Sequence, residues 1–114
     1  MSEKSDLIFL KHILDSINAI EEFSRGISRE ELVSNRMKQS AIVREIEIIG
    51  EAVKNISLEL KNKNKEVPWG DIAGTRDKMI HHYFGVDFEI IFGIINNDLP
   101  VLKKQIEKIK QGFS

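Results

Sequence analysis

Cysteine is absent from this 114-residue sequence, which excludes disulfide bonds and thiolate metal sites and is consistent with a reducing compartment. Long apolar runs are also absent. Stretches such as IIFGII at residues 90–95 fall far short of the roughly 18 residues that a membrane-spanning helix needs. The first residues, MSEKSD, are too charged for a secretory signal. We therefore expect a cytoplasmic protein that makes no contact with membranes.

An excess of charge of one sign is lacking as well. Lysine and arginine number 17 and aspartate and glutamate 18, which leaves a formal net charge of −1. Such a protein has no overall attraction for nucleic acid, so any contact with RNA must come from a local patch. Charged residues make up 31% and hydrophobic residues 41% of the chain, as in ordinary folded domains. We predict a single domain over residues 1–114.

Helical periodicity is present instead. Apolar residues three or four positions apart predict one helix over about residues 5–23 and a longer one over about residues 37–60. Between them, Gly26 is expected to end the first helix. Ser28 and Glu31 then have the spacing of a capping box, which predicts a short helix. Apolar and polar residues do not alternate with a period of two, so no strand is predicted.

The second half of the chain continues the helical pattern. Pro68 marks the start of a helix predicted to run from Trp69 to about Tyr83. Asp87 is predicted to cap the next helix, and Pro100 is expected to kink or restart the helix that closes the chain. The predicted fold class is all-α, an antiparallel bundle of four to five helices.

Arg76 does not fit a plain bundle. At about 100° per residue it lies in the middle of one face of the helix predicted from residue 69. The other members of this face are apolar or aromatic: Trp69, Ile72, Ala73, Met79, Ile80 and Tyr83. A guanidinium there is costly unless it is paired, reaches solvent or faces a wet cleft. A structural arginine, paired with a buried carboxylate such as Glu45, and a functional arginine in a cleft both satisfy this pattern.

Two histidines follow Arg76. On an ideal helix His81 projects about 140° away from it, so the two side chains meet only if the helix distorts near Gly85 or a second subunit contributes. His81 and His82 themselves diverge by about 100°, which makes them poor joint ligands of a metal. His12 is the one other histidine. We therefore predict no metal site.

A polar stripe runs along the helix predicted over residues 37–60. It consists of Arg44, Glu47, Glu51 and Lys54. Such stripes are most often solvated faces held by pairs three or four residues apart. Tyr83 returns to the side of Arg76 on an ideal helix, but a lone tyrosine is most often a packing residue whose hydroxyl is satisfied. The pattern alone assigns no role to these residues.

Residues 76–83, RDKMIHHY, read R-x4-H-x-Y. This resembles the signature of the HepT-like toxins, a branch of the HEPN superfamily whose general motif is R-x4-6-H. The context is similar to that family too, over roughly residues 5–110. The matching segments are EIIGEA at 47–52, PW at 68–69 followed by DIAG at 71–74, FGVD at 84–87 and NDLP at 97–100.

The resemblance implies an antiparallel HEPN-like bundle and a metal-independent ribonuclease without a cofactor. It also implies a homodimer in which two copies of the motif line one cleft, where residues that diverge on one helix can converge. Arg76 would bind the RNA phosphate, and His81 would act as acid or base. The supporting residues are Asp77, a candidate for orienting Arg76 or a histidine, with His82, Tyr83, Glu47 and Glu51.

The resemblance further implies a partner. HepT-like toxins are typically encoded beside a minimal nucleotidyltransferase antitoxin, which transfers AMP from ATP to the motif tyrosine, here Tyr83. Two alternatives stay open. One is a non-catalytic HEPN subunit that binds a nucleotide or docks a nucleotidyltransferase, and the other is a helical dimerisation protein whose Arg76 is structural. The intact pair of Arg76 and His81 favours the enzyme, whereas the net charge of −1 offers RNA no broad attraction.

Overall fold

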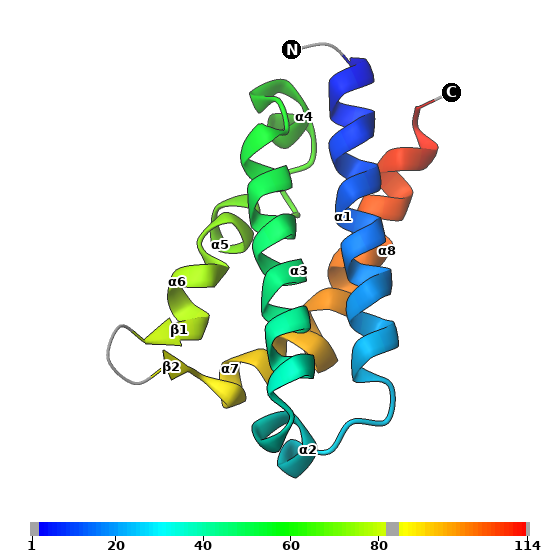
Figure 1. The fold of residues 1–114 in the computed structure, drawn as a ribbon. Coiled ribbons are helices and arrows are strands. Elements are labelled where there is room, and N and C mark those ends of the chain that lie inside the picture. Colours follow the sequence, from blue (N-terminus) through cyan, green and yellow to red (C-terminus); the bar gives the residue numbers. More distant parts are fainter. Residues whose placement is uncertain (1–2, 82–84, 114) are drawn as a thin grey trace.

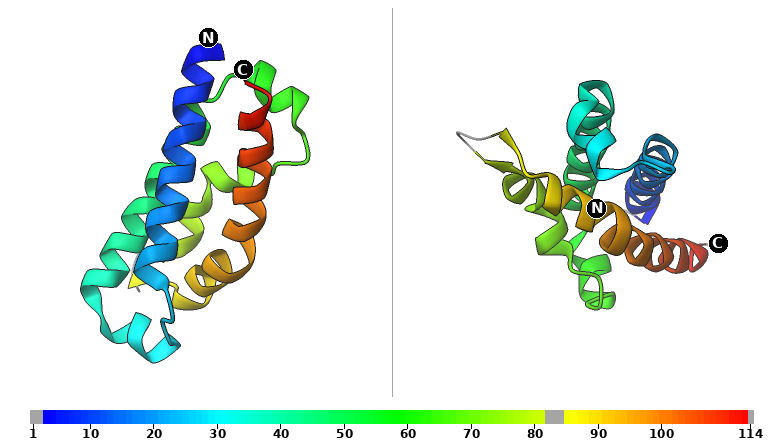
Figure 2. Two further views of the ribbon diagram at one scale, coloured as in Figure 1. Left: turned by 90° about the vertical axis from the view of Figure 1, so that its right-hand side faces the viewer. Right: turned by 90° about the horizontal axis from the view of Figure 1, so that it is seen from below.

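The computed structural model describes residues 3–81 and 85–113. Two long antiparallel helices, α1 (Glu3–Ser24) and α3 (Arg36–Asn55), pack side by side along the molecule (Figure 1). A third, α8 (Leu99–Gln111), runs antiparallel to α1, so that α1 begins and α8 ends at the same end of the bundle (Figure 2). The predicted all-α antiparallel bundle is confirmed, although two of the predicted helices divide into shorter ones.

The hydrophobic core lies where α1, α3 and the C-terminal helices meet. Fully buried residues recur on α1 every three or four positions, at Leu10, Ile13, Ile17 and Ile20. The same core contains a row on α3, formed by Ile42, Ile46, Ile49 and Val53. Burying one such side chain stabilises the fold by about 1.5–3 kcal/mol, so these two helices form its firm scaffold. Within residues 3–81 and 85–113, no helix has an apolar stretch of the length needed to cross a membrane.

The turn between α1 and α3 follows the sequence prediction. Gly26 adopts a left-handed conformation with φ of 68°, which glycine tolerates and which ends α1. The Ser28 side chain then accepts a hydrogen bond of 3.1 Å from the backbone N–H of Glu31, and α2 (Arg29–Ser34) follows. The predicted cap is therefore confirmed.

The helix predicted over residues 37–60 is wrong at its C-terminal end, because α3 stops at Asn55. Asp6 of α1 is buried, and its carboxylate accepts hydrogen bonds from the backbone N–H of Ser57 (2.8 Å) and from its hydroxyl (2.6 Å). The Ser57 hydroxyl oxygen also accepts from the backbone N–H of Leu60, and so caps α4 (Leu58–Lys63). The contact between Asp6 and Ser57 thus divides a stretch that the apolar periodicity predicted as one helix.

The helix predicted from Trp69 to Tyr83 is also wrong. It divides into α5 (Trp69–Ala73) and α6 (Thr75–Met79), separated by Gly74. After α6 the chain forms a short antiparallel pair, β1 (Ile80–His81) with β2 (Gly85–Val86), although no strand was predicted. In a continuing helix the carbonyl of Met79 would accept from residue 83, but here it accepts from the backbone N–H of Asp87 at 2.6 Å. The returning chain takes the place of the next helical turn.

The last helices begin where the sequence indicates. The side chain of Asp87 accepts from the backbone N–H of Ile90 at 3.1 Å and caps α7 (Phe88–Gly93), as predicted. A turn of π-helix, η1 (Ile94–Asp98), follows, and α8 starts with Pro100 in its first turn. A proline is tolerated there because its missing N–H has no helical partner at that position. The predicted restart near Pro100 is confirmed.

An ion pair fastens α8 to α1. Lys103 Nζ lies 2.8 Å from Glu21 Oε1, and this hydrogen bond raises the pKa of Lys103 above its ordinary value. A raised lysine pKa means that the pair stabilises the fold at neutral pH and is lost only as the pH rises through that raised pKa. Since the two side chains are 30% and 46% exposed, the contribution is at most about 1 kcal/mol.

Candidate functional site

Arg76 is held at the surface and not within an apolar face. Its side chain is 57% exposed, and its Nε donates a hydrogen bond of 2.5 Å to Glu47 Oε2 on α3. The predicted apolar face assumed one straight helix from residue 69, but the break at Gly74 turns α6 away from that line. Arg76 therefore meets the condition stated from sequence, since it is both paired and open to solvent.

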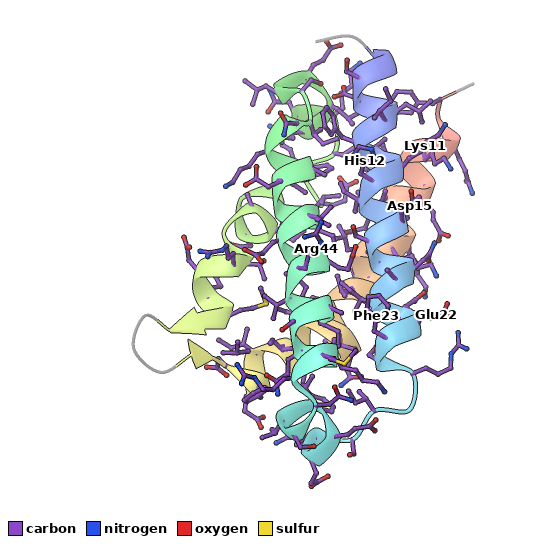
Figure 3. All side chains as sticks on the ribbon, in the orientation of Figure 1. Lys11, His12, Asp15, Glu22, Phe23 and Arg44 are labelled. Carbon is purple, nitrogen blue, oxygen red and sulfur yellow. The ribbon has the colours of Figure 1, made fainter. Side chains whose placement is uncertain are left out.

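The partner of Arg76 is Glu47, and Glu45, which was one alternative as its partner, does not pair with it. Residues 45 and 47 project about 160° apart on an α-helix, so they cannot both face α6. Glu47 belongs to the polar stripe of α3, which also contains Arg44, labelled in Figure 3. Its side chain is 37% exposed. The structure thus brings together one predicted catalytic residue and one predicted supporting residue.

Two other supporting residues are not brought into this contact. Glu51 is one turn further along α3, where its side chain is 70% exposed and pairs with Lys54 at 3.3 Å. Asp77 follows Arg76 on α6 and is exposed. Within the described part of the chain, no hydrogen bond or ion pair engages its carboxylate. Glu51 thus lies on a solvated polar stripe, and Asp77 makes no contact with Arg76.

The histidines and the tyrosine of the motif follow α6. The backbone of His81 belongs to β1, directly opposite Gly85 of β2. Because α6 ends at Met79, the 140° separation expected on a continuous helix does not apply to Arg76 and His81. His82 and Tyr83 lie outside the described residues. Among the residues that are described, no three histidine, cysteine or carboxylate side chains are grouped so that they could hold a metal ion.

The centre of the candidate site is thus Arg76. It is exposed, is held by a carboxylate, and belongs to a short helix that leads into the strand containing His81. The sequence model of the family described as ribonuclease HepT-like matches residues 13–109, which contain all of these elements. The chain belongs to the HepT-like ribonuclease family. The resemblance drawn from the R-x4-H-x-Y motif is therefore confirmed at the level of the family, which supports ribonuclease activity.

Individual relatives extend over nearly the whole HepT-like chain. A protein of Caldanaerobacter subterraneus subsp. tengcongensis, provisionally named an RNase, is 47% identical over 103 residues, or 90% of this chain and 92% of that protein. A probable ribonuclease HepT of Thermococcus cleftensis is 40% identical over 109 residues, or 96% and 99% of the two chains. A protein of Methanocaldococcus jannaschii, named as a gamma-glutamylcyclotransferase and provisional RNase, is 40% identical over 104 residues, and the match spans 91% of this chain but 47% of that protein. No solved structure is significantly similar.

A groove of about 650 Å3 also borders α6 in this HepT-like protein. It separates α5 and α6 from α7, η1 and α8, and its floor is apolar, with Ile46 and Ile49 of α3. Among the residues that line it, the carboxylates of Glu66, Asp71 and Asp98 outnumber the single ammonium group of Lys78, which itself lies 3.9 Å from Asp71. This acidic rim opposes an RNA backbone.

The spacing between the HepT-like motif and α3 depends on Gly50. A Cβ there would lie 3.5 Å from the carbonyl oxygen of Ile72 and 3.6 Å from that of Ala73, which is ordinary contact. We expect Gly50→Ala to leave RNA cleavage unchanged. Gly50→Leu must push α5 and α6 outward and separate Arg76 from Glu47, so we expect a stability loss of about 1–3 kcal/mol and cleavage at least tenfold slower. Thermal unfolding and an RNA cleavage assay check both variants, and equal activity of the leucine variant would contradict the role of this contact.

Proposed function

We infer that this HepT-like protein is a metal-independent RNA endonuclease, the toxin of a toxin–antitoxin pair, which acts in the cytoplasm as a homodimer. The observation that carries the inference is the state of Arg76. Its Nε is bonded to Glu47, while the terminal nitrogens of the guanidinium have no partner among the described residues and more than half of the side chain is exposed. A guanidinium held in this way is pre-positioned to take the oxygens of a phosphate.

The chemistry needs only groups that the chain contains. In metal-free RNA cleavage the 2′-oxygen attacks the adjacent phosphorus, the bond from phosphorus to the 5′-oxygen breaks, and a 2′,3′-cyclic phosphate and a 5′-hydroxyl remain. The reaction requires a proton acceptor, a proton donor and a cation that stabilises the charge on the pentavalent phosphorus. Arg76 supplies the permanent positive charge. His81, a histidine whose ordinary pKa lies near neutrality, supplies an acid or a base.

A homodimer completes the proposed cleft. Each protomer brings one copy of the segment with Arg76 and His81, and a two-fold axis near α6 would place two copies around one RNA strand. Two guanidinium groups would then offset the lack of a net positive charge over the whole protein. Family membership supports this arrangement.

The test of the proposed function is cleavage of total cellular RNA by the purified protein in excess EDTA. We expect products that end in 2′,3′-cyclic phosphates and 5′-hydroxyls, and mass spectrometry of the protein verifies that it carries no AMP. Sequencing of the product ends would identify the RNA that is cut. Unmodified dimers that leave all RNA intact would overturn the enzyme in favour of a non-catalytic subunit that binds nucleotide or docks a nucleotidyltransferase.

The proposed antitoxin is a minimal nucleotidyltransferase that attaches AMP to Tyr83. The tyrosine oxygen would attack the α-phosphorus of ATP, pyrophosphate would leave, and the tyrosine proton would pass to solvent. The added anionic nucleotides would compete with RNA for Arg76. We expect Tyr83→Phe to remain toxic in cells that express the nucleotidyltransferase, while the parent protein is silenced. Tyr83 is the sole tyrosine of the sequence, so an AMP group found on a tyrosine must be attached to Tyr83. Neutralisation of Tyr83→Phe by AMP transfer would contradict the assignment.

A further inference from the structure

Glu47 is placed to do more than hold Arg76. We propose that its carboxylate is the general base of the cleavage reaction, which takes the proton from the attacking 2′-hydroxyl and leaves His81 to act as the general acid. This inference rests on the proposed ribonuclease function and adds a residue of α3 to the R-x4-H motif.

The ion pair with Arg76 occupies only one of the two carboxylate oxygens of Glu47. The Arg76 Nε bonds to Oε2 at 2.5 Å, and no described residue donates a hydrogen bond to Oε1. The side chain as a whole is 37% exposed, which leaves a substrate hydroxyl room to approach the carboxylate. A carboxylate whose every oxygen was occupied, or one buried under the core, could not serve as a base.

The contact with Arg76 also fixes where the substrate would lie. A phosphate bound by the free nitrogens of Arg76 sits beside the guanidinium, and Glu47 touches that same guanidinium. The attacking 2′-oxygen belongs to the ribose next to this phosphate and approaches its phosphorus to about 3 Å before reaction. The nucleophile is therefore brought within reach of the carboxylate by the residue that binds the phosphate.

The charged groups around Glu47 are consistent with a base at this position. On α3, Arg44 and Glu51 lie about one turn before and after it, and Glu51 is occupied by Lys54. From α6, Arg76 faces it directly, whereas Lys78 of the same helix pairs with Asp71 of α5. No described carboxylate competes with Glu47 for the Arg76 guanidinium.

The reaction balances with these groups alone. The 2′-hydroxyl proton passes to Glu47 Oε1 as the bond from the 2′-oxygen to phosphorus forms. The bond from phosphorus to the 5′-oxygen then breaks, and that oxygen takes a proton from the His81 imidazolium. After the cyclic product leaves, Glu47 loses its proton to water and His81 regains one, which restores the starting state.

The decisive variant is Glu47→Gln, because the amide oxygen still accepts from Arg76 but cannot take a proton. We expect kcat to fall by about 10²–10⁴-fold, while the Kd for a 2′-deoxy analogue of the substrate changes less than threefold. Glu59→Gln, which changes an exposed carboxylate of α4 that pairs with Lys63 at 3.2 Å, is the matched control and should keep full activity.

A substrate with sulfur in place of the 5′-oxygen separates the base from the acid. Its thiolate leaving group needs no protonation, so His81→Ala should recover most of its activity on this substrate and Glu47→Gln should not. The inference is overturned if Glu47→Gln cleaves within tenfold of the parent rate, if the sulfur substrate rescues it, or if it binds the analogue more than tenfold more weakly. A parent protein that cleaves no RNA would instead remove the proposed function itself.

Discussion

Replacing Arg76 with alanine is expected to lower kcat/KM for RNA cleavage by about 10²–10³-fold, the usual effect of removing one preorganised group from a developing anion. The loss should be seen mainly in kcat, because the charge on the phosphorane grows in the transition state. Arg76→Lys should recover little of it. Arginine can bond to Glu47 through Nε and bind a phosphate through its two terminal nitrogens. A lysine side chain has a single nitrogen, so it cannot make both contacts in this way.

Lys78→Ala is the control for the Arg76 variants. Lys78 belongs to the same short helix, is 59% exposed and pairs with Asp71, so its removal alters the local charge by the same amount. We expect less than a threefold change in kcat/KM. If the two alanine variants lose activity equally, the effect is one of general charge and Arg76 has no special place in the reaction.

Replacing Asp6 with alanine is expected to lower the free energy of unfolding by about 3 kcal/mol, the largest effect that we predict for a polar side chain of this fold. The variant removes a buried carboxylate that accepts two hydrogen bonds from Ser57, and bonds to a charged acceptor contribute about 1.5–3 kcal/mol each before relaxation. It also unfastens α1 from the start of α4.

Urea unfolding of Asp6→Ala, beside Asp6→Asn and Asp15→Ala, measures this contribution. The two hydrogen bonds use different carboxylate oxygens, and asparagine replaces one of these with an NH2 group that cannot accept, so we expect roughly half of the loss. Asp15 is an exposed residue of the same helix, and its replacement should change the stability by less than about 0.5 kcal/mol. Equal effects at Asp6 and Asp15 would show that the bonds to Ser57 contribute nothing.

The helical class, the cap at Ser28 and the starts of α7 and α8 could be predicted because each depends on residues a few positions apart. The two wrong boundaries depend on distant residues. Asp6 ends α3 from across the bundle, and Asp87 closes α6 by donating its backbone N–H to Met79. Neither contact leaves a trace in the local periodicity of apolar residues.

For the same reason the site could be predicted only in part. The motif makes Arg76 and His81 candidates, but the pairing of Arg76 with Glu47 depends on the break between α5 and α6 at Gly74. A straight helix through residue 76 places the arginine among apolar side chains and suggests Glu45 as its partner. The available signal was the polar stripe of α3. It names Glu47 as one of several charged residues without saying which of them meets the motif.

Because α6 ends at Met79 and a β-hairpin follows, the number of residues between the arginine and the histidine of the motif can vary. Within one continuous helix, lengthening R-x4-H to R-x6-H would swing the histidine about 200° around the axis and move it about 3 Å along it. Here the arginine belongs to the last turn of a helix and the histidine to the segment that doubles back. Residues inserted between Met79 and Ile80 would lie outside α6 and would leave the arginine where it is. The ending of α6 thus makes the motif tolerant of length, a freedom that a single rigid helix could not have.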